Sequence, residues 1–329
     1  MSNKALLSLH NVTTKFNTDE GDITALNGVT FDVIKGRTLG IVGESGCGKS
    51  ITAASIMNLL PQPYGRVTEG EILFEGRDIT KLNEAERCKL RGHDISMIFQ
   101  DPMTALNPVV RVGKQVEEVY ELHSTKYTTD ATRRQAALEM FKKVGISEPE
   151  KRLDVYPHEL SGGMRQRVMI AMALACEPKV LIADEPTTAL DVTIQAQILE
   201  LMKRMQEELG MAILFITHDL GVVAEICDDV AVMYAGNVVE QGDVYQIFGK
   251  PTHPYTQGLL ASMPTVSSVP KTQLTTIEGS VPQLKDMPSG CRFVNRCTKA
   301  MDHCHSTRPE PALVEPGHLV SCLAVKEVM

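Results

Sequence analysis

The stretch Gly43-Glu44-Ser45-Gly46-Cys47-Gly48-Lys49-Ser50 decides the fold, because it fits the phosphate-binding pattern GxxxxGK[ST]. An apolar run, Thr38 to Val42, precedes it, and a helical pattern, Ile51 to Leu60, follows it. This succession of strand, glycine-rich loop and helix is the setting that the pattern requires. Glycines let successive backbone N–H groups turn toward phosphate oxygens, Lys49 reaches the β and γ phosphates, and Ser50 offers a hydroxyl to Mg²⁺. The sequence therefore predicts that the chain binds ATP or GTP.

A second apolar run, Val180 to Ala183, ends in two carboxylates, Asp184 and Glu185. Short runs of this kind fit buried parallel strands, whose ends carry functional loops. Beside a phosphate-binding loop, Asp184 would hold Mg²⁺ through water and Glu185 would polarise the water that attacks the γ phosphate. Taken alone, the two residues are equally compatible with a solvated acidic turn.

A second phosphate-binding helix start is predicted at Leu160-Ser161-Gly162-Gly163-Met164-Arg165-Gln166, which precedes the helical run Val168 to Cys176. A serine and two glycines there can donate a hydroxyl and backbone N–H groups to phosphate. An ordinary helix cap is the alternative for these residues taken alone. Since Lys49 already holds the γ phosphate from one side, we expect a dimer in which the Ser161 loop of each chain closes the nucleotide site of the other.

Length and charge limit the class of protein further. With 329 residues the chain has room for about two domains, and alternating β-branched and helical runs up to about residue 250 indicate an α/β fold. Acidic residues outnumber basic ones by 41 to 33, so the net charge of −8 argues against a nucleic-acid partner. We find no apolar run of bilayer length and no secretory signal, so a cytosolic protein is expected.

The composition changes near residue 250, after which nine of the 17 prolines occur. We therefore expect a small, loop-rich segment over residues 251–329, distinct from a nucleotide-binding domain over residues 1–250. This segment carries four cysteines that predict a metal or cluster site, Cys291, Cys297, Cys304 and Cys322. Four thiolates suit zinc or an iron–sulfur cluster, and zinc sites commonly include a C-x₂₋₄-C pair, which these cysteines lack. His303 and His305 could also serve as ligands.

Three motifs together, GESGCGKS, LSGGMRQ and LIADEPTTALD, resemble those of the nucleotide-binding subunits of ATP-binding cassette (ABC) transporters, over roughly residues 5–250. The resemblance implies a P-loop ATPase core of the RecA type, with an antiparallel β subdomain and a helical subdomain over about residues 100–175. It also implies that Gln100 in MIFQDPMTALNP is the family's Q-loop residue, that His218 in LFITHDL is its switch histidine, and that Asp191 belongs to its D-loop. Phe16 stands where the family places an aromatic ring under adenine.

The resemblance thus assigns four sets of residues. The expected catalytic residues are Lys49, Gln100, Glu185 and His218. The expected contacts to ATP and Mg²⁺ are Phe16, Gly43, Glu44, Ser45, Gly46, Cys47, Gly48, Lys49, Ser50, Ile51, Gln100 and Asp184. The expected signature residues acting in the partner's site are Ser161, Gly162, Gly163 and Gln166, and the expected D-loop residue is Asp191.

A narrower resemblance rests on DEPTTALDVTIQAQI, ITHDLGVVAE, MYAGNVVE and HPYTQGLL (His253 to Leu260), which are similar to stretches of dipeptide and oligopeptide importer ATPases. That group also includes relatives for nickel and glutathione. It implies a second, nonidentical ATPase subunit, two transmembrane permease subunits, an extracytoplasmic solute-binding protein and a peripheral location on the cytoplasmic face of the cell membrane. Some members carry a [4Fe–4S] cluster on such cysteines, so the cluster is favoured over Zn²⁺. The alternative class is a soluble cassette ATPase acting on ribosomes or DNA.

Overall fold

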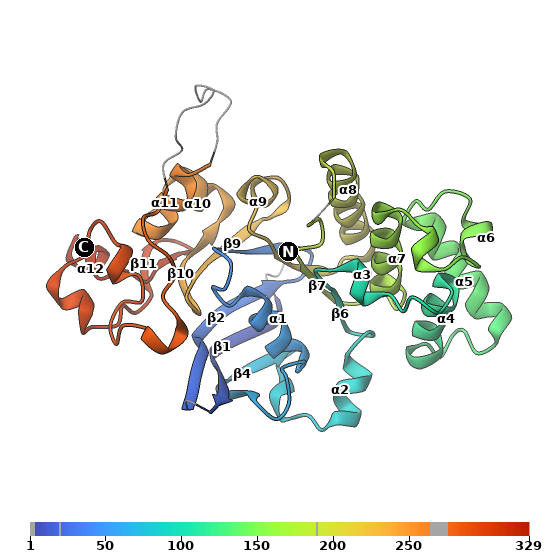
Figure 1. Cartoon of the computed structure of the whole chain (residues 1–329), viewed down its shortest axis with the longest axis horizontal. Coiled ribbons are helices and arrows are strands. Elements are labelled where there is room, and N and C mark those ends of the chain that lie inside the picture. The colour runs from blue at the N-terminus through green and yellow to red at the C-terminus, as the bar shows by residue number, and fades with distance from the viewer. Residues whose placement is uncertain (1–3, 20, 189, 264–275, 329) are drawn as a thin grey trace. The chain divides into compact units, whose positions relative to one another are not determined.

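The computed structural model describes residues 4–19, 21–188, 190–263 and 276–328, which form two compact units (Figure 1). The signature unit, named after the motif at Ser161, contains Met1–Leu6, Ile34–Gly36 and Lys81–Phe215. The P-loop unit contains Leu7–Val33, Arg37–Thr80 and Ile216–Met329. The P-loop unit thus combines residues from the first quarter and the last third of the chain.

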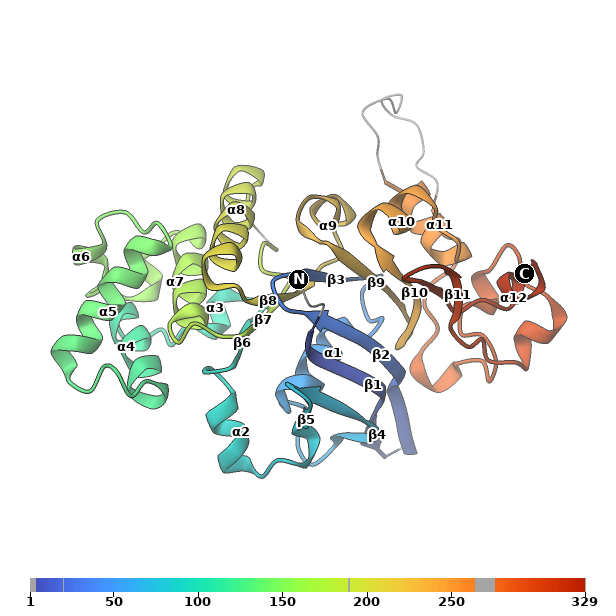
Figure 2. The ribbon, with the colours of Figure 1, turned by 180° about the vertical axis from the view of Figure 1, so that it is seen from behind.

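The P-loop unit contains an antiparallel sheet in the order β2-β1-β4-β5 (Figure 2). Its strands are β1 (Ala5–Thr18), β2 (Gly21–Ile34), β4 (Gly65–Phe74) and β5 (Arg77–Asp78). Strands β1 and β4 pair with Leu7 opposite Phe74 and Phe16 opposite Gly65. This sheet is the antiparallel β part that the fold class predicts.

A second set of strands in the same unit runs in the order β11-β12-β10-β9-β3. These strands are β3 (Thr38–Val42), β9 (Asp229–Tyr234), β10 (Asn237–Asp243), β11 (Ala312–Glu315) and β12 (His318–Val320). Strand β3 is buried at every position and pairs in parallel with β9, as expected for a strand covered on both faces. The two strands near the C-terminus, β11 and β12, extend the sheet on the side of β10.

The helices of the P-loop unit are α1 (Lys49–Met57), α9 (Leu220–Ile226), α10 (Val244–Gly249), α11 (Pro254–Ala261) and α12 (Leu323–Val328), with 3₁₀ turns η1 (Ile79–Lys81), η3 (Leu284–Asp286), η4 (Val294–Arg296) and η5 (Asp302–His305). Helix α1 ends at Asn58, whose φ of 50° lies in the left-handed region that asparagine tolerates at helix ends. Helix α9 begins at Asp219, whose side chain accepts hydrogen bonds from the backbone N–H groups of Gly221 and Val222.

The signature unit combines three strands with a group of helices (Figure 1). The strands are β6 (Ile95–Ile98), β7 (Val180–Asp184) and β8 (Ala212–Ile216), in the order β8-β7-β6. The helices are α2 (Glu84–Leu90), α3 (Pro102–Ala105), α4 (Val112–His123), α5 (Asp130–Lys143), α6 (Pro149–Arg152), α7 (Gly162–Leu174) and α8 (Val192–Leu209), with the 3₁₀ turn η2 (Pro157–Glu159). Helices α4, α5 and α7 pack against one another, in agreement with the predicted helical part. No helix among the described residues is long and apolar enough to cross a membrane.

A buried carboxylate joins the C-terminal strands to the rest of the P-loop unit. Glu240 of β10 is 1% exposed, and it accepts hydrogen bonds from the backbone N–H groups of Thr252 (2.7 Å) and His253 (3.0 Å). The ring nitrogen Nε2 of His318, on β12, lies 2.8 Å from its Oε1 atom. Three segments of the chain therefore meet at one side chain.

We expect Glu240→Ala to destabilise the protein, because it leaves two buried N–H groups and His318 without their acceptor. Removing one partner of a buried polar cluster costs about 3–5 kcal/mol, which for a chain of this size corresponds to a fall of about 6 °C or more in melting temperature. The change in melting temperature is measured by thermal unfolding followed by circular dichroism. Glu225→Ala, at an exposed position of α9, is the matched control and should change the melting temperature little. Equal effects of the two substitutions would contradict this role of Glu240.

Candidate active site

The phosphate-binding loop connects β3 to α1 in the P-loop unit. Gly43, Gly46 and Gly48 have φ values of 153°, 78° and 105°, which a residue with a Cβ atom rarely adopts. At Gly43 a Cβ atom would also lie 2.2 Å from the carbonyl oxygen of Met233, so no side chain fits there. The loop thus keeps the tight curve that turns backbone N–H groups toward a phosphate.

Lys49 has its charged end inside this curve. It is 5% exposed, and its Nζ atom donates to the carbonyl oxygens of Gly43 (2.8 Å) and Glu44 (3.1 Å). A buried ammonium group beside the N-terminus of α1 provides strong positive potential for phosphate oxygens. The glycines, Lys49 and the helix start therefore fit the triphosphate of a nucleotide.

The other predicted residues of the loop differ in how exposed they are to solvent. Cys47 is fully buried, its carbonyl oxygen accepts a hydrogen bond from the N–H of Gly236 (2.8 Å), and burial raises the pKa of its thiol. Its thiol is thus shielded from solvent, and its contact to the nucleotide stays a prediction. Ser45, Gly46 and Ser50 are exposed, whereas Ile51 is half-buried.

Two further predicted residues belong to the P-loop unit. Phe16 lies near the end of β1, is half-buried, and its ring packs against the side of Gly65 that lacks a Cβ atom. His218 is exposed and lies between β8 and α9. Their contacts to adenine and to the γ phosphate stay predictions.

The two predicted acids stand at the end of β7 in the signature unit. Asp184 is 4% exposed and is the last residue of the strand. Glu185 follows it with a φ of 47°, in the left-handed region that few non-glycine residues occupy. Strained backbone of this kind is found preferentially at functional sites, where the surrounding structure holds a side chain in a required direction.

Gln100 and Glu185 are brought together by the signature unit. The amide Nε2 of Gln100 donates to Glu185 Oε2 at 3.0 Å, and the hydroxyl of Thr188 donates to the same oxygen at 2.9 Å. Gln100 follows β6 and Glu185 follows β7, and these strands pair in parallel, so both residues lie at the same edge of the sheet. The carboxylate is thereby held in one orientation, as a group that positions a water molecule must be.

The signature residues form the start of α7. Ser161 is its N-cap, accepting from the backbone N–H of Met164 at 3.4 Å, and Ser161 and Gly162 are exposed. A Cβ atom on Gly163 would lie 2.8 Å from Ile194 Cγ2, so this glycine allows α7 and α8 to approach closely. Asp191 is exposed and caps α8 by accepting from the N–H of Ile194 (3.0 Å).

Gln166 occupies a different environment from the rest of the motif. It is 2% exposed, and its Nε2 atom has no hydrogen-bond partner among the described residues. Ser161 and Gly162 are therefore the members of the motif that a second chain can reach directly in this conformation.

The four cysteines of the C-terminal segment line one small cavity of about 20 Å³, together with apolar side chains such as Phe293. Cys304 is buried and the other three are half-buried. Burial raises the pKa of Cys291 to about 11 and also raises that of Cys297. Within the described parts of the chain, no group of three or more His, Cys, Asp or Glu side chains lies close enough together to hold a metal ion as it stands. The donor type and the shared cavity suit a thiolate-bound group, but the predicted cluster is not supported by preformed ligand geometry.

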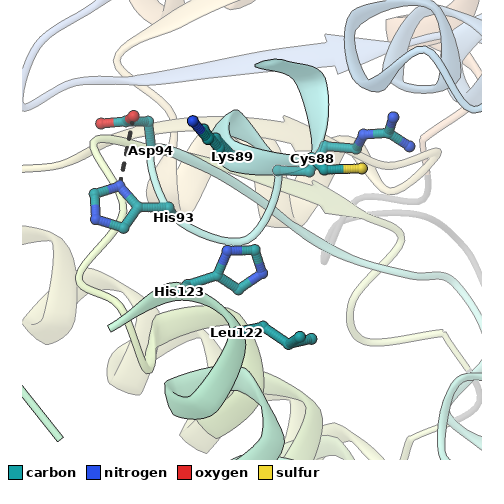
Figure 3. Close-up of a pocket in the computed structure, with 7 residues that line it drawn as sticks. Cys88, Lys89, His93, Asp94, Leu122 and His123 are labelled. Carbon is teal, nitrogen blue, oxygen red and sulfur yellow. Dashed lines mark ion pairs between the residues drawn. The ribbon is translucent and has the colours of Figure 1, made fainter. Parts of the chain in front are cut away.

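A surface hollow of about 690 Å³ lies in the signature unit, away from these motifs (Figure 3). Its lining includes Cys88, Lys89, Arg91, His93, Asp94, Leu122 and His123. His93 Nδ1 lies 3.5 Å from Asp94 Oδ2, and burial lowers the pKa of His123. Leu122 is 69% exposed at this hollow. These lining residues form no sequence motif that would point to this surface.

Two contacts of the P-loop were also not foreseen. The hydroxyl of Tyr255 accepts a hydrogen bond from the N–H of Glu44 (2.9 Å), and the guanidinium of Arg296 binds the Glu44 carboxylate. Both residues lie after residue 250. The stretch HPYTQGLL contains Tyr255, but its sequence alone does not indicate a partner more than 200 residues away.

Comparison with known proteins shows which family of nucleotide-binding proteins this chain resembles. A model of the ABC transporter family matches residues 26–188, and a model of the oligopeptide/dipeptide transporter C-terminal region matches residues 239–304. The oligopeptide transport ATP-binding protein OppD of Bacillus subtilis is 54% identical over 315 residues, which cover 96% of this chain and 87% of that protein. A probable peptide ABC transporter ATP-binding protein of Sinorhizobium fredii is 50% identical over 324 residues, covering 98% and 96% of the two chains.

Solved structures agree with this class. A dimeric ATP-binding cassette in a post-hydrolysis state, bound to ADP and Pi, superposes with a TM-score of 0.65 at 31% identity, covering 72% of this chain and 98% of that one. These matches confirm the expected fold and the expected enzymatic class. The chain is an ABC ATPase, and its P-loop and its Gln100–Glu185 pair agree with that class. More narrowly, the chain belongs to the family of ATP-binding proteins of oligopeptide and dipeptide ABC transporters.

We expect Glu185→Gln to keep ATP binding while turnover falls about 100-fold or more, because an amide cannot take up the proton of the attacking water. Phosphate release measures turnover, and size-exclusion chromatography with ATP, in the presence of the second ATPase subunit proposed below, should show an accumulated dimer of the two subunits. Lys49→Ala is the contrasting variant and should bind no ATP and form no such dimer. Substantial hydrolysis by Glu185→Gln would refute the role of Glu185.

Proposed function

We propose that this chain is the ATP-hydrolysing motor subunit of an importer for dipeptides or oligopeptides. Its relatives are described as oligopeptide, dipeptide and peptide transport ATP-binding proteins, and the similarity extends over nearly the whole chain. The observation that carries the proposal is this similarity, including the match of residues 239–304 to the oligopeptide/dipeptide transporter C-terminal region. The hydrogen bond between Gln100 and Glu185, at the carboxyl ends of β6 and β7, supports the ATP-hydrolysing role, because it orients a carboxylate that can act as a base. Import of nickel or glutathione is the second candidate, since the solute is selected by other subunits.

In the proposed mechanism, the P-loop N–H groups and Lys49 bind the β and γ phosphates. Asp184 and Ser50 would hold Mg²⁺, which would supply charge neutralisation on the transferred phosphoryl group. Glu185, oriented by Gln100 and Thr188, accepts a proton from water as the water oxygen bonds to the γ phosphorus and the bond to the β-γ bridging oxygen breaks. His218 would contact the γ phosphate.

The Ser161 loop of a second ATPase subunit would complete each site. Ser161 and Gly162 are exposed at the N-terminus of α7, a helix of 13 residues whose first N–H groups favour an anion. We propose a nonidentical second subunit, as the narrower resemblance implies. Two chains would then sandwich two ATP molecules, and binding and hydrolysis would close and open the pair.

The proposed membrane partners are two permease subunits at the cytoplasmic face of the cell membrane, supplied with solute by an extracytoplasmic binding protein. We propose that a permease loop contacts the hollow beside Leu122. Asp94, which lines that hollow, directly precedes β6, and Gln100 follows the other end of the same strand. A rigid strand thus connects the hollow to the residue that orients Glu185.

Purification of the tagged chain from its own host in mild detergent tests these partners. We expect two multispanning proteins and a second cassette ATPase to be recovered with it, as identified by mass spectrometry. Leu122→Glu should reduce recovery of the membrane proteins without weakening ATP binding, because it replaces an exposed apolar side chain at the hollow with a charged one. Tyr245→Glu, at a position 84% exposed on α10, is the matched control. Recovery of ribosomal or DNA-associated proteins alone would contradict the transport function.

We also propose that Cys291, Cys297, Cys304 and Cys322 hold a [4Fe–4S] cluster, with Zn²⁺ as the alternative. The four thiols that line one place in this segment support it, and a cluster would crosslink a segment that has a small core. This crosslinking role needs no redox partner.

Anaerobic purification tests this assignment. We expect brown protein with visible charge-transfer absorption and equal amounts of iron and sulfide. Cys304→Ser should abolish the absorption, while Cys88→Ser, at an exposed position outside the cavity, should leave it unchanged. Zinc without sulfide would support the alternative, and metal-free protein would refute both.

A further inference from the structure

Arg296 connects the cysteine segment to the phosphate-binding loop. It is the last residue of the 3₁₀ turn η4, which lies between Cys291 and Cys297. Its Nη1 atom donates to Glu44 Oε2 at 2.6 Å, and its Nη2 atom donates to Glu44 Oε1 at 3.0 Å. This bidentate pairing is the strong and directional form of an arginine–carboxylate contact.

The guanidinium of Arg296 is fixed on its other sides as well. Its side chain is 4% exposed, its Nε atom donates to the carbonyl oxygen of Glu278 (2.9 Å), and Nη2 also donates to that of Ile277 (3.3 Å). The group lies over the ring of Tyr234, 5.8 Å from the ring centre. The pKa of Arg296 is raised, mainly by its hydrogen bond to Glu44. These contacts hold the guanidinium of Arg296 in one position.

Glu44 is the second residue of the phosphate-binding loop, and three groups hold it. Its N–H donates to the hydroxyl of Tyr255, its carbonyl oxygen accepts from Lys49 (3.1 Å), and its carboxylate binds Arg296. Two of these three groups come from residues after position 250. The segment that carries the cysteines therefore helps to shape the loop.

A carboxylate in a loop that must hold a triphosphate is electrostatically unfavourable, because both groups are negative. Near a protein surface, such repulsion between charges a few ångströms apart is large enough to change ligand affinity about tenfold. The paired guanidinium cancels that charge and turns the carboxylate toward the C-terminal segment. Glu44 then stabilises the loop without opposing the nucleotide.

We propose that Arg296 is a positioning residue of the nucleotide site, supplied by the C-terminal segment, which neutralises Glu44 and fixes the loop for ATP. This inference rests on the proposed ATP site and adds a residue to it from outside the nucleotide-binding domain predicted at residues 1–250. Because Arg296 directly precedes Cys297, the conformation of the cysteine segment also influences ATP affinity.

The test compares ATP dissociation constants by isothermal titration calorimetry with full-length protein. Arg296→Ala should weaken ATP binding about tenfold, because it leaves the Glu44 charge unpaired beside the phosphates. Combining it with Glu44→Gln should restore most of the affinity, since the unpaired charge is then absent. Arg296→Lys should give an intermediate dissociation constant, because lysine keeps the positive charge but cannot form the bidentate pair. Lys299→Ala, which removes an exposed cation near Cys297, is the matched control and should bind ATP normally.

An unchanged dissociation constant in Arg296→Ala would overturn the proposal. Weak binding that Glu44→Gln does not restore would also overturn it, because a merely structural role predicts no rescue by removal of a charge. Should Arg296→Ala fail to fold, the ATP dissociation constants of Arg296→Lys and of the double variant Glu44→Gln/Arg296→Lys are compared instead. Absence of ATP binding in the unaltered protein would instead refute the proposed nucleotide site.

Discussion

The negative charge of a triphosphate has to be met by N–H groups and a lysine that converge on one small volume, and the P-loop unit is built around this requirement. The loop can curve tightly only because Gly43 lies against the carbonyl oxygen of Met233, which requires β9 to lie beside β3. On the other side, the N–H of Gly236 donates to the carbonyl oxygen of Cys47. The turn between β9 and β10 and the buried β3 therefore determine the shape of the nucleotide site.

The C-terminal segment takes part in this arrangement. Strand β12 pairs with β10, the buried Glu240 ties β10 to His253 and His318, and Tyr255 and Arg296 reach the loop itself. A segment that sequence composition describes as loop-rich is thus held by buried polar contacts as well as by strands. Such contacts fix a conformation, because each group loses its partner if the segment detaches.

The sequence predicted those features whose cause is local. Strand, glycine loop and helix follow from Thr38 to Leu60, the acids follow β7, and Ser161 caps α7 because a serine before two glycines favours a helix start. The hydrogen bond between Gln100 and Glu185 depends on the parallel pairing of β6 and β7, for which neither segment carries a local signal. Arg296 was missed because its partner lies 252 residues away, and an arginine beside a cysteine carries no local signal for a phosphate-binding loop.

Asp184 is proposed to hold the Mg²⁺ of the bound nucleotide, and the proposed ATPase chemistry depends on this role. The most direct test measures ATP affinity with and without Mg²⁺ in the unaltered protein and in Asp184→Asn. Because Mg²⁺ held by Asp184 would neutralise phosphate charge, the unaltered protein should gain affinity for ATP when Mg²⁺ is added, and Asp184→Asn should lose most of that gain while still binding ATP through the loop. An equal gain from Mg²⁺ in both proteins would contradict the account.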